Sequence, residues 1–220
     1  MVDTEYKAKR LEIDSKDFEV EDLKPAVVAL KKGGIIAYPT ETVYGLGASI
    51  FHQKAIQKIF GIKRRDPHKP ISAMISSLEI VDGLCTEIPE YARTLMDLYW
   101  PGPLTLVLKA SQNMPRYMTC SERKIGLRFP DHPITRALMV HHQQPITSTS
   151  ANMTGSEPPI TATELDVKIQ SQIDMIVDAG PCTIKIPSTV IDCAPDGPKL
   201  LRQGSITFAE IEESLQRVNG

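Results

Sequence analysis

The chain has 220 residues, of which 41% are hydrophobic and 24% are charged, so its composition is that of an ordinary globular protein. This balance excludes a wholly disordered, collagen-like or coiled-coil chain. The 25 basic and 27 acidic residues give a formal net charge of −2. A polybasic protein is therefore excluded, and any site for nucleic acid or nucleotide must be local.

No run approaches the ~18 consecutive apolar residues of a membrane span, and no apolar segment follows the charged N-terminus. Four cysteines stand singly, without the paired spacing of a zinc site. They are Cys85, Cys120, Cys182 and Cys193. We therefore expect a cytoplasmic protein with reduced thiols, no membrane association and no protein-bound metal.

Helix-like and strand-like segments alternate along the chain. An apolar stripe closed by two glycines predicts a helix over 21–32, and the next apolar run predicts a buried strand over 35–38. A helix is predicted over 53–60, a strand over 71–75, and capping-box spacing predicts helices opening at Ser76, Thr161 and Thr207. Further strands are predicted over 104–108, 125–129, 145–149, 175–177 and 189–191. Residues 10–13 either add an edge strand or form no regular structure.

This alternation predicts one α/β domain over residues 1–220, built on a twisted sheet of mixed parallel and antiparallel strands with flanking helices. No repeat, low-complexity tract or Gly/Ser linker divides the chain. The P-loop, GxSxG and HExxH motifs are absent, and Gly45-Leu-Gly47 is followed by Ile50 where a dinucleotide fingerprint needs glycine. The chemistry must therefore lie in other loops.

The loop over 38–47 (YPTETVYGLG) crowds two threonines, a carboxylate and a phenol into one turn after a predicted strand. An ordinary strand-to-helix connection, in which Thr40 or Thr42 bonds its own backbone, is an equal alternative. The loop over 146–156 continues a strand into a series of uncharged hydroxyls and one amide. Such a loop offers neutral donors to an anion. A plain Ser/Thr-rich loop is the other interpretation.

The segment over 61–70 (GIKRRDPHKP), between a predicted helix and a predicted strand, places four fixed cations and His68 within seven positions, and Pro67 and Pro70 restrict its backbone. A stiff loop that gathers cations suits a polyanion such as a triphosphate, although solvated charge runs are common. In an extended loop, the side chains of Lys63 and Arg65 would leave on the same side.

Arg128 stands in an apolar predicted strand, and Arg202 lies near the end of the chain. An arginine that points inward needs an anion partner, which is either a carboxylate of the protein or a carboxylate of a ligand.

Together these loops resemble those of the YrdC-like family, the threonylcarbamoyl-AMP synthases. The resemblance covers roughly residues 20–205 and rests on seven motifs in order. They are YPTETVYGLG at 38–47, KRR with HKP at 63–70, WPGPLTLVL at 100–108, IGLRFPDHP at 125–133, STSANMTG at 148–155, PSTVID at 187–192 and LRQG at 201–204. The resemblance implies a sheet that curls around a large, basic, concave cavity. It also implies the short, single-domain form of the family.

The resemblance assigns the candidate site residues by motif. The catalytic tetrad that holds the ATP phosphates is implied to be Lys63, Arg65, Ser150 and Asn152. Further nucleotide contacts are implied at Lys69, Lys124, Ser148 and Arg202. L-threonine is implied to bind Thr42, Arg128 and Ser188, with Arg128 pairing with its carboxylate.

The implied reaction joins L-threonine, bicarbonate or CO2, and ATP to give threonylcarbamoyl-AMP and pyrophosphate. It is the first step of threonylcarbamoyladenosine formation in tRNA, 3′ of the anticodon, and a downstream tRNA threonylcarbamoyl transferase is the implied acceptor. Mg²⁺ is expected on the ATP phosphates, without a dedicated cage of carboxylates.

Two alternatives remain open. One is a module that binds double-stranded RNA or tRNA through a basic patch, formed by Lys58, Lys63, Arg64, Arg65 and Lys69. The low aromatic content of 5% argues against it, because stacking platforms need aromatic side chains. The other is a paralogue that keeps the fold without the synthase activity.

Overall fold

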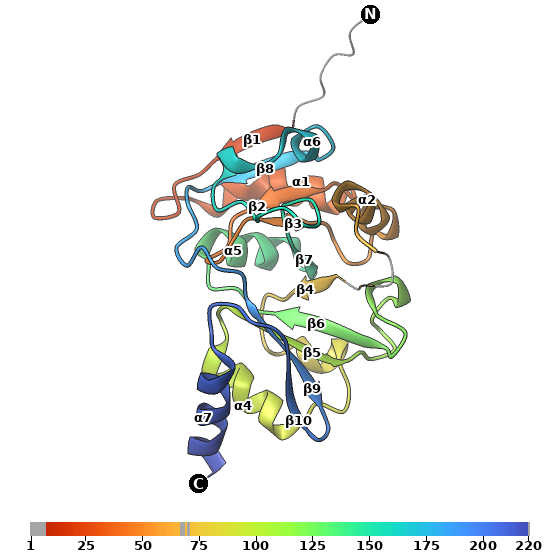
Figure 1. The fold of residues 1–220 in the computed structure, drawn as a ribbon. Helices are drawn as coiled ribbons and strands as arrows, with labels where there is room; N and C mark the ends of the chain where they lie inside the picture. Colours follow the sequence, from red (N-terminus) through yellow and green to blue (C-terminus); the bar gives the residue numbers. More distant parts are fainter. Residues whose placement is uncertain (1–7, 67–68, 70, 220) are drawn as a thin grey trace, which may run out of the picture.

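The computed structural model describes residues 8–66, 69 and 71–219 (Figure 1). Pro67 and Pro70, which were expected to stiffen the loop, and His68, which was counted with its cations, lie outside the described residues. The described strands form one ten-stranded sheet, in the order β1-β8-β2-β3-β7-β4-β6-β5-β9-β10. Four of its pairings are parallel and the other five are antiparallel, which confirms the predicted mixed sheet.

The strands are short, and most of them coincide with apolar runs. Their bounds are β1 Lys9–Glu12, β2 Ile36–Tyr38, β3 Gly45–Gly47, β4 Ser72–Met74, β5 Leu104–Lys109, β6 Lys124–Arg128, β7 Ile146–Ser150, β8 Met175–Asp178, β9 Thr189–Ala194 and β10 Gly197–Arg202. The seven predicted strands from 35–38 onward all fall on these elements. The N-terminal segment does add an edge strand, β1, parallel to β8.

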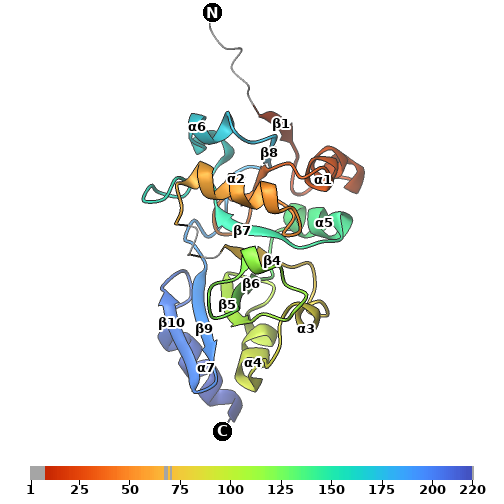
Figure 2. The same ribbon diagram turned by 90° about the vertical axis from the view of Figure 1, so that its right-hand side faces the viewer.

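Helices lie on both sides of the sheet. Their bounds are α1 Lys24–Lys31, α2 Gln53–Lys63, α3 Val81–Leu84, α4 Glu90–Tyr99, α5 Pro133–His142, α6 Val167–Gln170 and α7 Phe208–Asn219, with 3-10 turns η1 Val20–Leu23, η2 Arg116–Met118 and η3 Ala162–Glu164. One buried cluster packs α1 and α5 against β2 and β8. The larger cluster packs α2, α4 and α7 with residues of β2, β3, β4, β5, β6, β8 and β9. Figures 1 and 2 both show α4 and α7 together, at the end of the molecule opposite β1.

Two of the three predicted capping boxes were wrong as helix starts. The helix expected at Ser76 begins only at Val81, and the Glu79 carboxylate turns back to Ser77 instead of capping a helix. At Thr161 the chain forms only the 3-10 turn η3, because the Glu164 carboxylate accepts from the Ile160 N–H one residue too early. The third box is confirmed: Thr207 and Glu210 exchange hydrogen bonds of 2.7 and 3.2 Å at the start of α7.

Strand β3 was interpreted as part of a loop, and β10 was not predicted at all. β3 consists of two glycines and one leucine, so it lacks the β-branched residues that signal a strand. Tertiary packing explains it: a Cβ on Gly45 or Gly47 would lie 2.8 or 2.9 Å from the ring of Tyr38 on the neighbouring strand. The Gly-x-Gly spacing therefore lets β3 lie flat over a buried tyrosine.

Candidate active site

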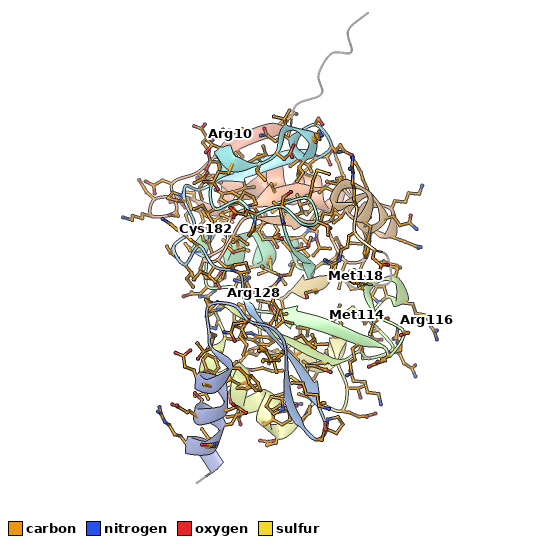
Figure 3. All side chains as sticks on the ribbon, in the orientation of Figure 1. Arg10, Met114, Arg116, Met118, Arg128 and Cys182 are labelled. Atoms are coloured by element: carbon orange, nitrogen blue, oxygen red, sulfur yellow. The ribbon has the colours of Figure 1, made fainter. Side chains whose placement is uncertain are left out.

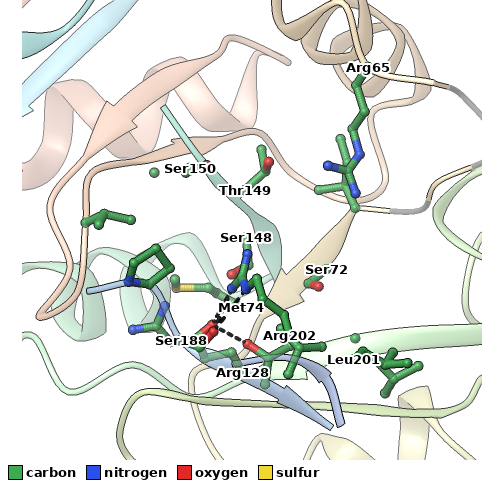
Figure 4. Close-up of a pocket in the computed structure, with 18 of the residues that line it drawn as sticks. Arg65, Ser72, Met74, Arg128, Ser148, Thr149, Ser150, Ser188, Leu201 and Arg202 are labelled. Carbon is green, nitrogen blue, oxygen red and sulfur yellow. Dashed lines mark hydrogen bonds between the residues drawn. The ribbon is translucent and has the colours of Figure 1, made fainter. Parts of the chain in front are cut away.

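A cavity of about 620 Å³ lies where the sheet curls between β3 and β10. Its walls come from the loop after β2, the C-terminal end of α2, the end of β7 and the strands β4, β6, β5, β9 and β10. Figure 4 shows Arg65, Arg128 and Arg202, which come from the segment after α2, from β6 and from β10, among the residues that line it. The large concave cavity implied by the resemblance is therefore present.

All of the predicted site residues except Lys69 and Thr42 line this cavity. Lys69 is exposed, and it contributes its backbone carbonyl, which accepts from Arg65 Nε at 3.0 Å. Thr42 is fully buried just behind the wall, where its hydroxyl accepts from Arg128 Nη2 at 2.9 Å. The structure thus brings together segments that are up to about 160 residues apart in the chain.

Arg128 at the end of β6 is held by the protein itself. Its Nη2 lies 2.7 Å from Glu41 Oε1, and both side chains are almost fully buried, at 5% and 6% exposure. Its Nε donates to the Gly102 carbonyl at 3.3 Å. Of the two partners left open by the sequence, the protein carboxylate is therefore present, and a ligand carboxylate at Arg128 stays a prediction. Figure 3 places Arg128 near the middle of the molecule, far from Arg10 on β1.

The loop after β2 combines both interpretations given to it. Thr40 Oγ1 accepts from the N–H groups of Thr42 and Val43 and donates to the Val43 carbonyl at 2.7 Å, so Thr40 closes its own turn. The same turn delivers Thr42 and Glu41 to Arg128. A structural hydroxyl and the two side chains that hold the arginine therefore occupy consecutive positions.

Ser188 and Arg202 meet beside Arg128. Arg202 Nη2 donates to the Ser188 carbonyl at 2.8 Å and to its hydroxyl at 3.1 Å, as Figure 4 shows. The Ser188 hydroxyl also bonds Thr105 Oγ1 at 2.9 Å. Gly204 allows this arrangement, because a Cβ there would lie 2.3 Å from the Pro187 carbonyl oxygen and 2.4 Å from Ser188 C. The glycine of the LRQG motif is thus required by a close backbone approach.

Lys63 does not leave an extended loop beside Arg65, and that prediction was wrong. Lys63 is the last residue of α2, which continues three residues beyond the predicted end because Ile62 extends its buried stripe. Arg64 then adopts a left-handed conformation, with φ of 48°. The Arg65 N–H returns to the Phe60 carbonyl at 3.0 Å, a common way to end a helix. The two basic side chains consequently depart from differently oriented backbone.

Lys63 is buried beneath the turn that follows β7. Its ammonium donates to the carbonyls of Ser150 and Asn152, the second at 2.6 Å, and lies 3.3 Å from Asn152 Oδ1. Burial and the nearby Arg65 lower the pKa of Lys63 to about 8. Lys63, Ser150 and Asn152 of the predicted tetrad therefore form one hydrogen-bonded cluster, and Arg65 lines the same cavity.

Positive charge accumulates in this cavity. Burial, together with Arg128 and Arg65, lowers the pKa of Arg202, and burial lowers the pKa of Arg65. Among the described residues, the carboxylates in the lining are Glu122 and Asp192, and both lie against Lys124. The hydrogen bonds that Lys124 donates to Asp192 raise the pKa of Lys124. Glu41 behind the wall pairs with Arg128, but among the described lining residues no carboxylate pairs with Arg202, and this part of the cavity suits an anion.

Several contributors to the site were not predicted. Glu41 was noted as a carboxylate in its turn without a role, and Thr105 and Asp192 carried no signal besides their place in the WPGPLTLVL and PSTVID motifs. Cys120 lies partly exposed in the cavity wall, whereas Cys85, Cys182 and Cys193 are buried free thiols. The contacts of Glu41, Thr105 and Asp192 with other site residues depend on the strand order, which the sequence alone did not provide.

The sequence profile of the Sua5/YciO/YrdC family, described as telomere recombination, matches residues 28–204. The chain belongs to this family. A threonylcarbamoyl-AMP synthase of Bacillus subtilis is 40% identical over 189 residues, which are 85% of this chain and 54% of that protein. A threonylcarbamoyl-AMP synthase of Vibrio cholerae is 34% identical over 84% of this chain and 98% of its own length.

The fold of this Sua5/YciO/YrdC family member agrees with that of a solved relative. The crystal structure of Pyrococcus abyssi Sua5 complexed with L-threonine aligns with a TM-score of 0.87 and 36% identity, over 94% of this chain and 60% of that one. The chain thus spans little more than half the length of the Bacillus and Pyrococcus relatives. Within the described part of the chain, no helix is long and apolar enough to cross a membrane.

Proposed function

We propose that the protein is an L-threonylcarbamoyladenylate synthase, which converts L-threonine, bicarbonate or CO2, and ATP into threonylcarbamoyl-AMP and pyrophosphate. The observation that carries the proposal is one cavity that is lined by Arg128 and Ser188 at one end, and by Arg65 and the Ser150–Asn152 turn at the other. The names of the Bacillus, Vibrio and Pyrococcus relatives support it.

The Arg128 end suits the carboxylate of L-threonine. Two nitrogens of its guanidinium are bound by Glu41, Thr42 and Gly102, so the group cannot rotate. Its Nη1 has no partner among the described residues and is available to a ligand. Thr42, Arg128 and Ser188 are the residues that we assign to threonine. The fixed guanidinium would bind a planar carboxylate better than a flexible ammonium would.

The opposite end suits the triphosphate. We assign Arg65, Ser150 and Asn152 to the phosphates together with the charge of Lys63, and Ser148, Lys124 and Arg202 to the rest of the nucleotide. Lys69 is assigned to the nucleotide together with these three residues, although it lies outside the lining. Charge grows on the leaving pyrophosphate, so a preorganised cation at Arg65 stabilises the transition state more than the bound substrate.

The chemistry then needs positioning more than a protein nucleophile. The threonine amine attacks CO2, which forms the N–C bond of a carbamate. The nitrogen then releases a proton. A carbamate oxygen attacks the α-phosphorus of ATP, the P–O bond to the β-phosphate breaks, and pyrophosphate leaves with that electron pair. Both reactants are anions, so the cations at the two ends must offset their repulsion. A recessed cavity also protects the short-lived carbamate from water.

Mg²⁺ is expected on the nucleotide. Glu122 and Asp192 are the lining carboxylates among the described residues, and both are engaged by Lys124. This donor set fits a metal held mainly by phosphate oxygens and water, because Mg²⁺ usually keeps several waters and few protein ligands. When bound, the metal would neutralise phosphate charge.

The product is a labile mixed anhydride, so the reaction needs a consumer close at hand. We propose that a tRNA threonylcarbamoyl transferase accepts it, in the cytoplasm, to complete threonylcarbamoyladenosine in tRNA. Residues 1–220 would act in this step as one domain, since all the described strands belong to one sheet.

The experiment is pyrophosphate release by the purified protein with ATP, Mg²⁺ and bicarbonate, with and without L-threonine. We expect release that requires both threonine and bicarbonate, together with the adduct by mass spectrometry. ATP binding without threonine-dependent release would indicate a paralogue with another substrate. RNA binding that weakens steeply with salt, without ATP binding, would indicate an RNA-binding module.

A further inference from the structure

Lys63 uses its side chain in an unusual way for a residue in an anion-binding cavity. An ammonium has three N–H donors, and three oxygens surround this one: the Ser150 carbonyl, the Asn152 carbonyl and Asn152 Oδ1. The whole residue is 3% exposed. A lysine that grips phosphate as a point charge needs a free proton directed at it, and Lys63 has none to spare.

The same turn is tied to Lys63 through the backbone as well. The Thr154 N–H donates to the Lys63 carbonyl at 3.0 Å, and the Ala151 N–H donates to the Tyr44 carbonyl at 2.8 Å. Asn152 Oδ1 also accepts from the Ser150 hydroxyl, and Asn152 Nδ2 donates to the Ser156 carbonyl at 2.5 Å. Lys63 thus lies at the centre of a closed hydrogen-bond network that determines the shape of the turn.

The ammonium also orients peptide groups. In a trans peptide the C=O and the following N–H point in opposite directions. The Asn152 carbonyl faces Lys63, so the Met153 N–H points away from it, and that N–H has no partner among the described residues. The second proton of Asn152 Nδ2 is also unassigned. The oxygens of the turn therefore face the lysine, while the Met153 N–H and one Nδ2 proton of Asn152 are left to donate to a ligand.

We propose that Lys63 is a positioning residue, which holds the Ser150–Asn152 turn in the shape that receives the phosphates and does not itself contact them. This inference rests on the proposed function for its ligand, ATP, but the geometry of the turn exists without ligand. It separates Lys63 from Arg65, whose guanidinium we assign to the phosphates. The two basic residues of the Lys-x-Arg motif therefore perform different tasks.

A set of ATP-binding measurements with Mg²⁺ present tests this division. Lys63→Met is made in the wild-type chain and in a Ser150→Ala/Asn152→Ala background, and Arg65→Met is made in both as the matched control. We expect Lys63→Met to weaken ATP binding at least about tenfold in the wild-type chain, and by a factor at least about threefold smaller once the turn lacks its side chains, because only the backbone donors that Lys63 orients then remain. Arg65→Met should cost the same factor, about tenfold or more, in both backgrounds.

An equal loss for Lys63→Met in both backgrounds would overturn the proposal, since a direct phosphate contact does not depend on the turn. Absence of ATP binding by the wild-type protein would instead overturn the proposed function. Hydrogen exchange then still tests the role of Lys63 without nucleotide. We expect the amides of Ala151 and Thr154 to exchange at least about tenfold faster in Lys63→Met, while β7 and α2 stay protected.

If Lys63→Met does not fold, the same hydrogen-exchange experiment can be done on the wild-type chain by changing the pH. The pKa of Lys63 is about 8, so its charge is lost as the pH rises past that value. After correction for intrinsic rates, protection of Ala151 and Thr154 should fall above about pH 8, and Lys63→Arg, which keeps its charge, should abolish this dependence. Protection that is independent of pH in the wild type, or a fall that persists in Lys63→Arg, would contradict the proposal.

Discussion

Replacing Arg128 by methionine should affect stability and threonine binding separately. The substitution leaves the Glu41 carboxylate without its counter-ion at a site where both side chains are about 95% buried. Removing one partner of a buried ion pair costs roughly 3–5 kcal/mol. For a chain of this size each kcal/mol lowers Tm by about 2–4 °C, so we expect a loss of roughly 6–20 °C.

The matched control is Arg93→Met, the same substitution in an exposed pair. Arg93 lies 2.7 Å from Asp82, with 45% and 65% of the two side chains exposed, so its loss should cost less than about 1 kcal/mol. A double variant, Arg128→Met with Glu41→Gln, removes both buried charges and should recover at least half of the lost stability.

Calorimetric titration of the stable double variant then isolates the role of Arg128 in binding. Loss of a charge-assisted contact to the threonine carboxylate, about 1.5–3 kcal/mol, should weaken threonine binding roughly 10- to 150-fold. ATP affinity should change less than about threefold. The reasoning fails if Arg128→Met is as stable as Arg93→Met. It fails equally if the double variant binds threonine as the wild type does.

The remaining predictions concern the backbone, the phosphates and a buried histidine. Gly204→Ala should lower the free energy of unfolding by more than about 3 kcal/mol and weaken threonine binding, because its Cβ would lie within 2.4 Å of backbone atoms of Pro187 and Ser188. Gly155→Ala is the control, since Gly155 has a φ of 90° but open space around it. Equal losses of stability in a denaturant titration of the two variants would contradict the argument. Arg65→Ala should lower turnover more than tenfold while Tm changes little, as steady-state kinetics and a melting curve will show; wild-type turnover would refute it. Burial, with Lys31 and His52 nearby, lowers the pKa of His142 to about 4. As the pH falls from about 6.5 to 4, the histidine therefore binds a proton in the unfolded chain before it does so in the folded one. The free energy of unfolding should fall by up to roughly 3 kcal/mol over this range. His142→Leu should flatten that part of the denaturation profile, and an unchanged slope would count against it.

Local chemistry predicted much of the fold and the site. Apolar runs indicated the inner strands, because such strands are buried whatever their neighbours are. Concentrations of hydroxyls and cations at strand ends indicated which loops face the cavity. The resemblance supplied roles for residues such as Ser188, whose own surroundings in the sequence gave no signal.

The missed features depend on long-range packing. β3 is a strand because its glycines lie against the Tyr38 ring. Tyr38 precedes Gly45 by seven residues, so the local sequence around the glycines does not indicate this contact. Lys63 was placed in a loop because the helix was predicted to end at residue 60, although Ile62 continues the stripe of Ile56 and Ile59. Glu41 and Arg128 are 87 residues apart, so only the strand order pairs them.

Labelled bicarbonate tests the central claim most directly. The purified protein is incubated with ATP, Mg²⁺, L-threonine and carbon-13 bicarbonate, and the products are separated and weighed by mass spectrometry. We predict threonylcarbamoyl-AMP that carries the label in its carbamoyl carbon, formed in equal amount with pyrophosphate and absent when threonine is omitted. Pyrophosphate released without a labelled adduct, or an adduct of AMP and threonine without the added carbon, would contradict the assignment of this cavity to threonylcarbamoyl-AMP synthesis.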